Sequence, residues 1–325
     1  MPRLTSSLPP LVVVAISMTT ANAADKGPTY LDPEKAGPDF QTQGEYEGKI
    51  GNDTKVGVQV IALGEGKFDA IVYGNGLPGA GWDPKQPKIR LKGERKGDQV
   101  PFTGLNFNGT IADGVFSGTA ENDVKFELRK VHRSSPTMGL KPPEGAIVLF
   151  DGTNVDALAE GKIEEEKLLG VPVRSKQKFN NYTLHLEFRT PFMPEARGQG
   201  RGNSGMYLND QYECQILDSF GLEGENNECG GFYQIQKPSV NMCLPPLSWQ
   251  TYDVEFQAAK YDSEGKKVTP AIATVRQNGV LIHDKLKLPH TTPGGGQNDE
   301  KLPGSLFLQD HGDPVRFRNI WVVEK

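Results

Sequence analysis

The chain has 325 residues, a formal net charge of −5 and 36% hydrophobic residues, and it contains 38 Gly and 24 Pro. The acidic balance gives no support for a nucleic-acid partner. The Gly and Pro content favours short strands joined by many turns over long helices.

Residues 1–23 have the pattern of a signal peptide. Arg3 supplies a positive charge, residues 8–18 form a short apolar core, and Ala21-Asn22-Ala23 is typical of a cleavage site. The apolar core is about half the length of a membrane-spanning helix, which needs about 20 residues. We therefore expect export to the periplasm or the extracellular space, cleavage after Ala23 or Ala24, and no membrane span.

The next segments differ in composition. Residues 24–40 are polar, and we expect them to be mobile. Within residues 41–131, apolar side chains alternate with small or polar ones, as at Val56, Val58 and Val60, which predicts a small all-β module. Residues 132–145 are rich in Ser, Pro and Gly, and they predict a linker between two domains.

Residues 146–325 contain several longer strand patterns. YTLHLEFR (182–189) and WQTYDVEFQ (249–257) alternate apolar with polar residues, and several acids lie on the polar faces. In ATVRQNGVLIHD (273–284), Asn-Gly between two strand patterns predicts a hairpin with a type I′ turn. Many antiparallel strands in about 180 residues predict an all-β sandwich or jelly roll.

The densest polar cluster is RGNSGMYLNDQYECQILDSFG, residues 201–221. We expect the strands at 205–208 and 212–217 to pair as a hairpin. The cluster combines carboxylates, amides and an arginine, a mixture that suits the hydroxyl groups of a sugar. The alternative is a surface of ordinary turn residues. The candidate residues are Arg201, Asn203, Ser204, Glu213, Gln215 and Asp218.

Three interpretations apply to LQDHGDP, residues 308–314. Its Gly and Asp-Pro are typical of a tight turn. Two neighbouring acids can also tune His311 for general acid or base chemistry. The third interpretation is metal binding, for which one His is a weak zinc signal. Oxygen ligation of Ca²⁺ or a similar divalent cation needs no fixed spacing, and Glu213 and Asp218 are then the candidate ligands.

The chain contains three cysteines. Cys229 and Cys243 flank a short segment, and we predict a disulfide between them in an exported protein. Cys214 lies within a strand pattern and is expected to pack as a buried thiol.

Six segments between residues 146 and 325 resemble the 3-keto-disaccharide hydrolase family. They are FDGTNVDAL, YTLHLEFR, RGNSGMYLNDQYECQILDSFG, SWQTYDVEF, NGVLIHD and GSLFLQDHGDPVRFRNIWV. The resemblance implies a concanavalin A-like jelly roll that acts on glycosides oxidised at C3 of the sugar. In that chemistry the ketone acidifies the C2 proton, the group at C1 leaves by elimination, and water then adds. No redox cofactor is expected for this step.

The resemblance suggests roles for individual residues. His311 is the expected general base or acid, and Glu213 its acid/base partner or a metal ligand. Arg201 is expected to hold sugar hydroxyls or to stabilise the enolate oxygen. A bound metal is the alternative to Arg201 in that role. Asp310 is expected to orient His311. The residues expected to position the sugar are Asn203, Gln215, Asp218 and Glu187.

A carbohydrate is the expected partner in either of two functions. The first is the glycoside-cleaving enzyme described above. The second is a non-catalytic carbohydrate-binding or adhesive module, because folds of this type do not fix function. A binding module would need polar groups and aromatic platforms but no acid/base pair such as His311 and Glu213.

Overall fold

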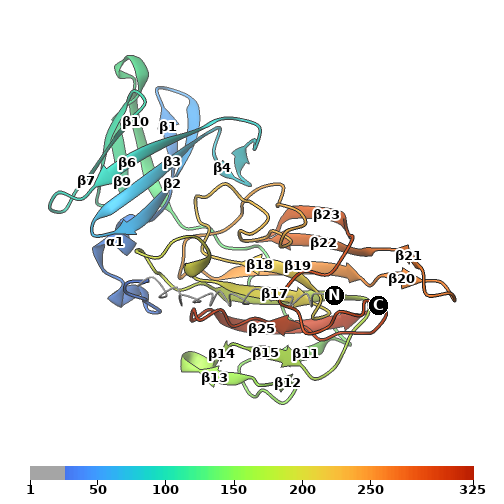
Figure 1. The fold of residues 1–325 in the computed structure, drawn as a ribbon. Coiled ribbons are helices and arrows are strands. Elements are labelled where there is room, and N and C mark those ends of the chain that lie inside the picture. The colour runs from blue at the N-terminus through green and yellow to red at the C-terminus, as the bar shows by residue number, and fades with distance from the viewer. Residues whose placement is uncertain (1–25) are drawn as a thin grey trace, which may run out of the picture.

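The computed structural model describes residues 26–325, so the predicted signal peptide lies outside the described residues. The chain forms an N-terminal β-barrel and a C-terminal two-sheet sandwich (Figure 1). Within the described part, no helix combines the length and apolar character needed to cross a membrane. The helices are all short: η1 (Pro33–Lys35), α1 (Gly37–Thr42), η2 (Glu121–Asp123), η3 (Glu165–Lys167) and η4 (Gly198–Gly200).

The N-terminal module is a closed barrel in which strands adjacent in sequence pair antiparallel. Closure removes the exposed edges that an open sheet of this size would present. Interior-facing side chains such as Val58, Phe68 and Phe102 fill the barrel. The barrel strands are β1 (Gly44–Ile50), β2 (Thr54–Gly64), β3 (Lys67–Gly74), β6 (Lys88–Glu94), β7 (Val100–Gly104), β8 (Phe107–Ala112), β9 (Val115–Thr119) and β10 (Lys125–Val131).

The segment expected to be mobile is held by contacts in the structure. Tyr30 exchanges backbone hydrogen bonds with Phe192, and Phe40 packs edge-on against the same ring. Asp39 pairs with Arg95 at 3.2 Å. These contacts place α1 at the end of the barrel that faces the sandwich (Figure 1). The segment is polar overall, but its two aromatic residues, Tyr30 and Phe40, anchor it.

The sandwich confirms the predicted all-β class. Its larger sheet contains β13 (Lys162–Glu164), β14 (Leu168–Gly170), β25 (Arg316–Glu324), β16 (Tyr182–Arg189), β19 (Gln250–Gln257), β22 (Ala271–Gln277) and β23 (Val280–Leu288) in that order, with β11 (Ile147–Phe150) paired to β25. Its smaller sheet has the order β12 (Leu158–Ala159), β15 (Val173–Ser175), β24 (Phe307–Leu308), β17 (Ser204–Leu208) and β18 (Tyr212–Ile216).

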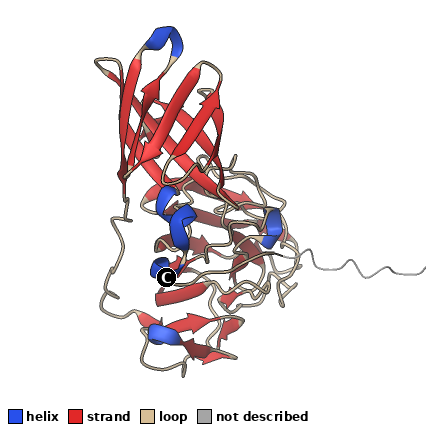
Figure 2. Cartoon of the chain, turned by 90° about the vertical axis from the view of Figure 1, so that its left-hand side faces the viewer, coloured by secondary structure: helices blue, strands red, loops and turns tan. Residues whose placement is uncertain are grey.

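Two short strand pairs lie outside these sheets: β4 (Leu77–Pro78) with β5 (Gly81–Trp82), and β20 (Lys260–Tyr261) with β21 (Lys267–Thr269). The predicted Asn-Gly hairpin joins β22 to β23. Asn278 and Gly279 both have positive φ, 51° and 79°, as a type I′ turn requires. Figure 2 shows that strands dominate both domains.

The two sheets of the sandwich enclose one apolar core. On β16, Leu184, Leu186 and Phe188 face this core, and on β18 Cys214 and Ile216 face it from the other sheet. Because side chains alternate along a strand, the residues between them point to the two outer faces of the sandwich. The outer face of the smaller sheet therefore carries Glu213, and that of the larger sheet carries Glu187.

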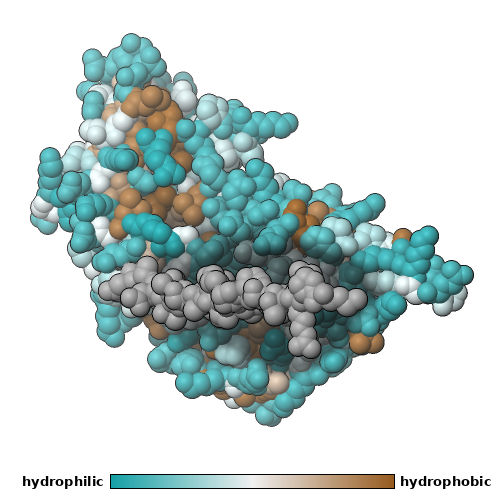
Figure 3. Space-filling model, in the orientation of Figure 1, coloured by the Kyte–Doolittle hydropathy of each residue, from teal (hydrophilic) through white to brown (hydrophobic). Residues whose placement is uncertain are grey.

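The barrel packs directly against the sandwich. Ile61, Ile71 and Tyr73 belong to the sandwich core cluster although they lie on β2 and β3. The Arg197 guanidinium donates to the Leu63 carbonyl at 2.6 Å, and Lys88 pairs with Glu223 at 2.7 Å. Figure 3 shows hydrophobic residues gathered on the barrel part of one face, with hydrophilic residues over most of the remaining visible surface.

Candidate active site

Strand register aligns polar side chains on the outer face of the smaller sheet, which we call the site face. One row runs from Glu213 through Tyr207 and Phe307 to Arg174, and the next row contains Gln215 and Gly205. The hairpin of β17 and β18, predicted from the sequence, creates this alignment. Gln309 continues the second row, because its backbone N–H donates to the Gly205 carbonyl at 2.9 Å.

Glu213 has the properties of a proton-transfer group. It is 4% exposed, and burial raises the pKa of its carboxyl from 4.5 to about 7, although a hydrogen bond with the Tyr207 hydroxyl lowers it in part. A carboxyl with this pKa can accept and release a proton near neutral pH. Its backbone N–H donates to Thr292 Oγ1 at 2.8 Å, which fixes the strand beside the 289–304 segment.

Gly205 leaves room for the Glu213 carboxylate. A Cβ added at Gly205 would collide with Glu213 Oε1 and would lie 3.0 Å from the Tyr207 ring. The glycine is therefore required by close approach of a side chain, and its own φ is not in the left-handed region.

Three polar atoms beside this face are buried and have no hydrogen-bond partner in the described part of the chain: Asn203 Oδ1, Gln309 Oε1 and Arg201 Nη2. Such atoms cost about 1–3 kcal/mol each when they stay unpaired. Hydroxyl groups of a bound sugar would supply both donors and acceptors to them. Asn203 is oriented by Nδ2, which donates to the Gln199 carbonyl at 2.8 Å.

Arg201 and Asp218 are held by each other. Arg201 Nε donates to Asp218 Oδ2 at 2.6 Å, and Arg201 Nη1 donates to the Ala62 carbonyl of the barrel at 3.2 Å. Asp218 Oδ1 also accepts the Phe220 N–H at 3.4 Å. The pair thus stabilises the contact between domains, and only Nη2 of Arg201 remains for the enolate role predicted from the sequence.

The turn that carries His311 lies beside the start of β17. Ser204 Oγ donates to the Gln309 carbonyl at 2.7 Å, and the Asn203 N–H donates to Asp313 Oδ2 at 2.8 Å. The three segments expected to form the site are therefore adjacent. His311 itself is exposed and has no hydrogen-bond partner among residues 26–325.

The prediction that Asp310 orients His311 is wrong. Asp310 Oδ1 accepts the N–H of Gly312 at 2.8 Å, because an aspartate reaches the backbone two residues on more easily than the adjacent side chain. The second acid, Asp313, is the buried one. Besides Asn203, it binds Lys26 Nζ at 2.6 Å, so it holds the His311 turn in place.

The expectation that Glu187 positions the sugar is also wrong. Glu187 lies on the outer face of the larger sheet, on the opposite side of the sandwich from Glu213. It accepts from the Gly139 N–H at 2.6 Å, from Arg318 Nε at 2.6 Å and from Asn319 Nδ2 at 2.9 Å. These bonds attach residues 132–145, the segment between the two domains, to β16 and β25, so Glu187 has a structural role.

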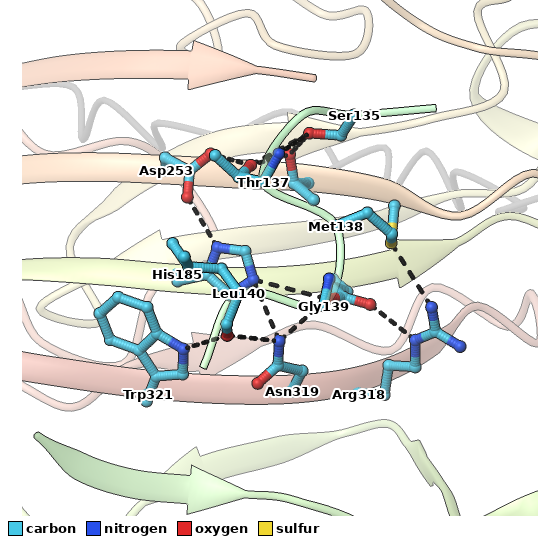
Figure 4. A network of polar contacts seen from close by, with 12 residues as sticks. Ser135, Thr137, Met138, Gly139, Leu140, His185, Asp253, Arg318, Asn319 and Trp321 are labelled. Carbon is cyan, nitrogen blue, oxygen red and sulfur yellow. Dashed lines mark hydrogen bonds and ion pairs between the residues drawn. The ribbon is translucent and has the colours of Figure 1, made fainter. Parts of the chain in front are cut away.

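His185 completes the same network (Figure 4). Its Nδ1 is 2.6 Å from Asp253 Oδ1, its ring stacks on Trp321, and Thr137 Oγ1 donates to Asp253 Oδ2 at 2.6 Å. Burial opposes the charged imidazole, but the hydrogen bond to Asp253 and the Glu187 carboxylate, 3.6 Å from Nε2, raise the pKa of His185 above 6.5. All these groups have partners, which marks the network as a clamp on residues 135–140.

The predicted disulfide is absent. Cys229, Cys243 and Cys214 are all free, buried thiols, as was expected for Cys214 alone. Cys229 Sγ contacts Tyr252 Oη at 3.3 Å and Gln277 Nε2 at 3.2 Å, and Cys243 Sγ contacts the Leu217 carbonyl at 3.4 Å. Polar neighbours thus satisfy both sulfurs inside the core.

Metal ligation was the other alternative for Glu213 and Asp218. The described residues contain no group of three or more His, Cys, Asp or Glu side chains that could hold a metal ion. Asp218 is turned toward Arg201.

Sequence reasoning missed three residues of this region. Tyr207 stands opposite Glu213 in the hairpin, so the predicted pairing already contained the signal. Gln309 lies within the stretch LQDHGDP, in which only His311 and its neighbouring acids form a recognisable acid–base pattern. Thr292 lies in a loop whose path no local pattern predicts.

The region from the interdomain segment onward matches known proteins. Residues 145–323, more than half of the chain, match the family model described as "3-keto-alpha-glucoside-1,2-lyase-like domain". A crystal structure of a "putative glycosyl hydrolase" from Parabacteroides distasonis is 33% identical, with a TM-score of 0.52, over 56% of this chain and 85% of that chain.

A second structure with the same description, also from Parabacteroides distasonis, is 16% identical with a TM-score of 0.42, over 56% of this chain and 95% of that chain. A comparison with curated proteins gave no match. On the strength of the family model, the chain belongs to the 3-keto-disaccharide hydrolase family.

Proposed function

We propose that the protein is a glycoside-cleaving enzyme that acts on 3-keto-glycosides. The observation that carries the proposal is Glu213, a buried carboxyl with a pKa near 7 on a sheet face bordered by unpaired polar atoms. Perturbed carboxyls of this kind cluster at functional sites. The family match and the name of the P. distasonis structure support a glycoside as substrate.

The chemistry needs one proton acceptor and one proton donor. The acceptor removes the C2 proton, and the electron pair of the C2–H bond forms an enolate with its charge on the C3 oxygen. Collapse of the enolate breaks the bond between C1 and the leaving oxygen, which takes a proton from the donor. Water then adds at C1 and a proton returns to C2, so the balance is hydrolysis.

We assign the proton transfer at C2 to Glu213. Its pKa allows the carboxylate to form at neutral pH and to return the proton in the last step. His311, exposed on the adjacent turn, is assigned as the second proton-transfer group. Asn203, Gln215 and Gln309 would hold the sugar hydroxyls, and Arg201 Nη2 is the cationic donor for the C3 oxygen.

The experiment compares a 3-keto-glucoside with its unoxidised parent. Wild-type protein should release the aglycone from the oxidised substrate only. Glu213→Gln and His311→Ala should each lower turnover by about a hundredfold or more, the usual scale for acid–base groups. Binding of both sugars without release of aglycone would favour the non-catalytic binding module instead.

A further inference from the structure

A cavity lies where α1, the barrel and the sandwich meet, and it shares no residue with the site face. Its volume is about 180 Å³. The walls include Phe40 from α1, Lys130 from β10, and Pro245 and Pro246 from a sandwich loop. The size corresponds to a molecule of roughly ten non-hydrogen atoms, and the prolines and Phe40 make the walls largely apolar.

One wall of this cavity has a buried amide without an acceptor. Gln43 is 2% exposed, and its Oε1 accepts the Ala62 N–H at 3.0 Å. That bond fixes which end of the amide is oxygen. Gln43 Nε2 then has no hydrogen-bond partner among residues 26–325, and an acceptor on a bound ligand would supply one.

Lys130 adds a cation without a counter-charge. Interior-facing Phe126 and Leu128 precede it on β10, so alternation directs the Lys130 side chain toward the inside of the barrel end. Its stem passes over Gly44, where an added Cβ would lie 2.7 Å from Lys130 Cε. The ammonium donates to the Gln41 carbonyl at 2.5 Å and forms no ion pair with any residue in 26–325.

The other charges at the cavity do not compensate Lys130. Glu45 is paired with Arg133, with Arg133 Nη2 at 2.5 Å from Glu45 Oε1 and Nε at 2.7 Å from Oε2. His132 is exposed. Burial lowers the pKa of Lys130 to about 8, the direction expected for an ammonium that lacks an anionic partner.

We propose that this cavity binds a small carboxylate with a compact apolar body. The carboxylate would accept hydrogen bonds from Lys130 Nζ and Gln43 Nε2, and the apolar body would pack against Phe40 and the two prolines. Such a ligand would contact both domains at once and hold the barrel against the sandwich. The proposal is independent of the chemistry at Glu213.

Calorimetric titration of the full chain with cyclohexanecarboxylate tests the proposal, with cyclohexanemethanol as the neutral ligand of the same shape. The carboxylate should bind and the alcohol should bind at least tenfold more weakly. Lys130→Met removes the charge but keeps the stem, and it should weaken carboxylate binding at least tenfold. Lys125→Met, at an exposed position of the same strand, is the matched control and should leave affinity unchanged.

A second variant guards against a folding defect in Lys130→Met. Gln43→Glu keeps an oxygen for the Ala62 N–H but replaces the unpaired amide donor with a negative charge, so this variant should abolish binding. Full affinity in either cavity variant would overturn the proposal. Equal binding of the alcohol, or no binding of the carboxylate at millimolar concentration, would overturn it as well.

Discussion

The Glu213 carboxylate lies where a side chain at Gly205 would otherwise be. A Cβ at Gly205 would collide with Glu213 Oε1, and the Tyr207 ring closes the other side. We therefore predict that Gly205→Ala displaces the carboxylate and lowers kcat at least tenfold, since small misplacements of a reacting group are costly. Steady-state kinetics should be compared with Gly74→Ala, an exposed barrel position where an added Cβ would make only an ordinary contact, 3.6 Å from Gln86 Oε1. Unchanged kcat in Gly205→Ala would argue against a role for Glu213 at that position.

Glu213 should reduce the stability of the fold at neutral and alkaline pH. Its folded-state pKa is raised, so the free energy of unfolding should be highest below about pH 4.5 and should fall as pH rises to about 7. Each unit of difference between the folded-state and unfolded-state pKa corresponds to about 1.4 kcal/mol, so the carboxylate costs roughly 3 kcal/mol of stability above pH 7.

Glu213→Gln should therefore be more stable than wild type at pH 8 and no more stable at pH 4, as measured by urea unfolding. The exposed Glu264→Gln serves as the control and should show no such difference. Equal stability of Glu213→Gln and wild type at pH 8 would mean that the carboxyl is not buried as described.

The network around His185 should affect the stability of the fold without affecting the site face, because it lies on the other sheet. The raised pKa of His185 implies stabilisation that is complete below about pH 6.5 and is lost as pH rises through the folded-state value. We expect His185→Gln to cost about 1–3 kcal/mol at pH 6, and less at pH 9. His290→Gln, at an exposed histidine, is the control. A loss of stability that does not change with pH would contradict a charged His185.

The barrel should support the active site through β2. Ile61 packs against Gly221, where an added Cβ would collide with the Ile61 side chain, and Ala62 accepts from Arg201. Ile61→Ala should therefore cost about 2–5 kcal/mol of stability and also lower kcat. Val58→Ala, inside the barrel, should cost stability but leave kcat unchanged, as thermal unfolding and kinetics together would reveal. If both variants changed kcat equally, the result would contradict a supporting role of β2 at the active site.

Alternation and turn chemistry predicted much of the fold. The pattern in residues 182–189 correctly separated Leu184 and Leu186 from His185 and Glu187, because the apolar core covers only one side of this strand and leaves a period of two. The Asn278-Gly279 turn was equally readable, since few residues tolerate positive φ at both positions.

The features that the sequence did not predict depend on contacts between segments that are far apart in the chain. Alternation places Glu187 on a polar face, but it does not say which of the two outer faces of the sandwich that is. Closure of the barrel depends on pairing between β1 and β10, far apart in sequence, which no local pattern reveals. Asp310 and Asp313 look equivalent in the sequence, and only the approach of Asn203 makes Asp313 the buried one.

The pH dependence of kcat/KM on a 3-keto-glucoside tests the central claim most directly. If Glu213 removes the C2 proton, the rate should rise with pH to a midpoint near 7, where the carboxylate forms, and Glu213→Gln should lose both this limb and most of the activity. Equal cleavage of the unoxidised glucoside, or an unchanged rising limb in Glu213→Gln, would contradict the account.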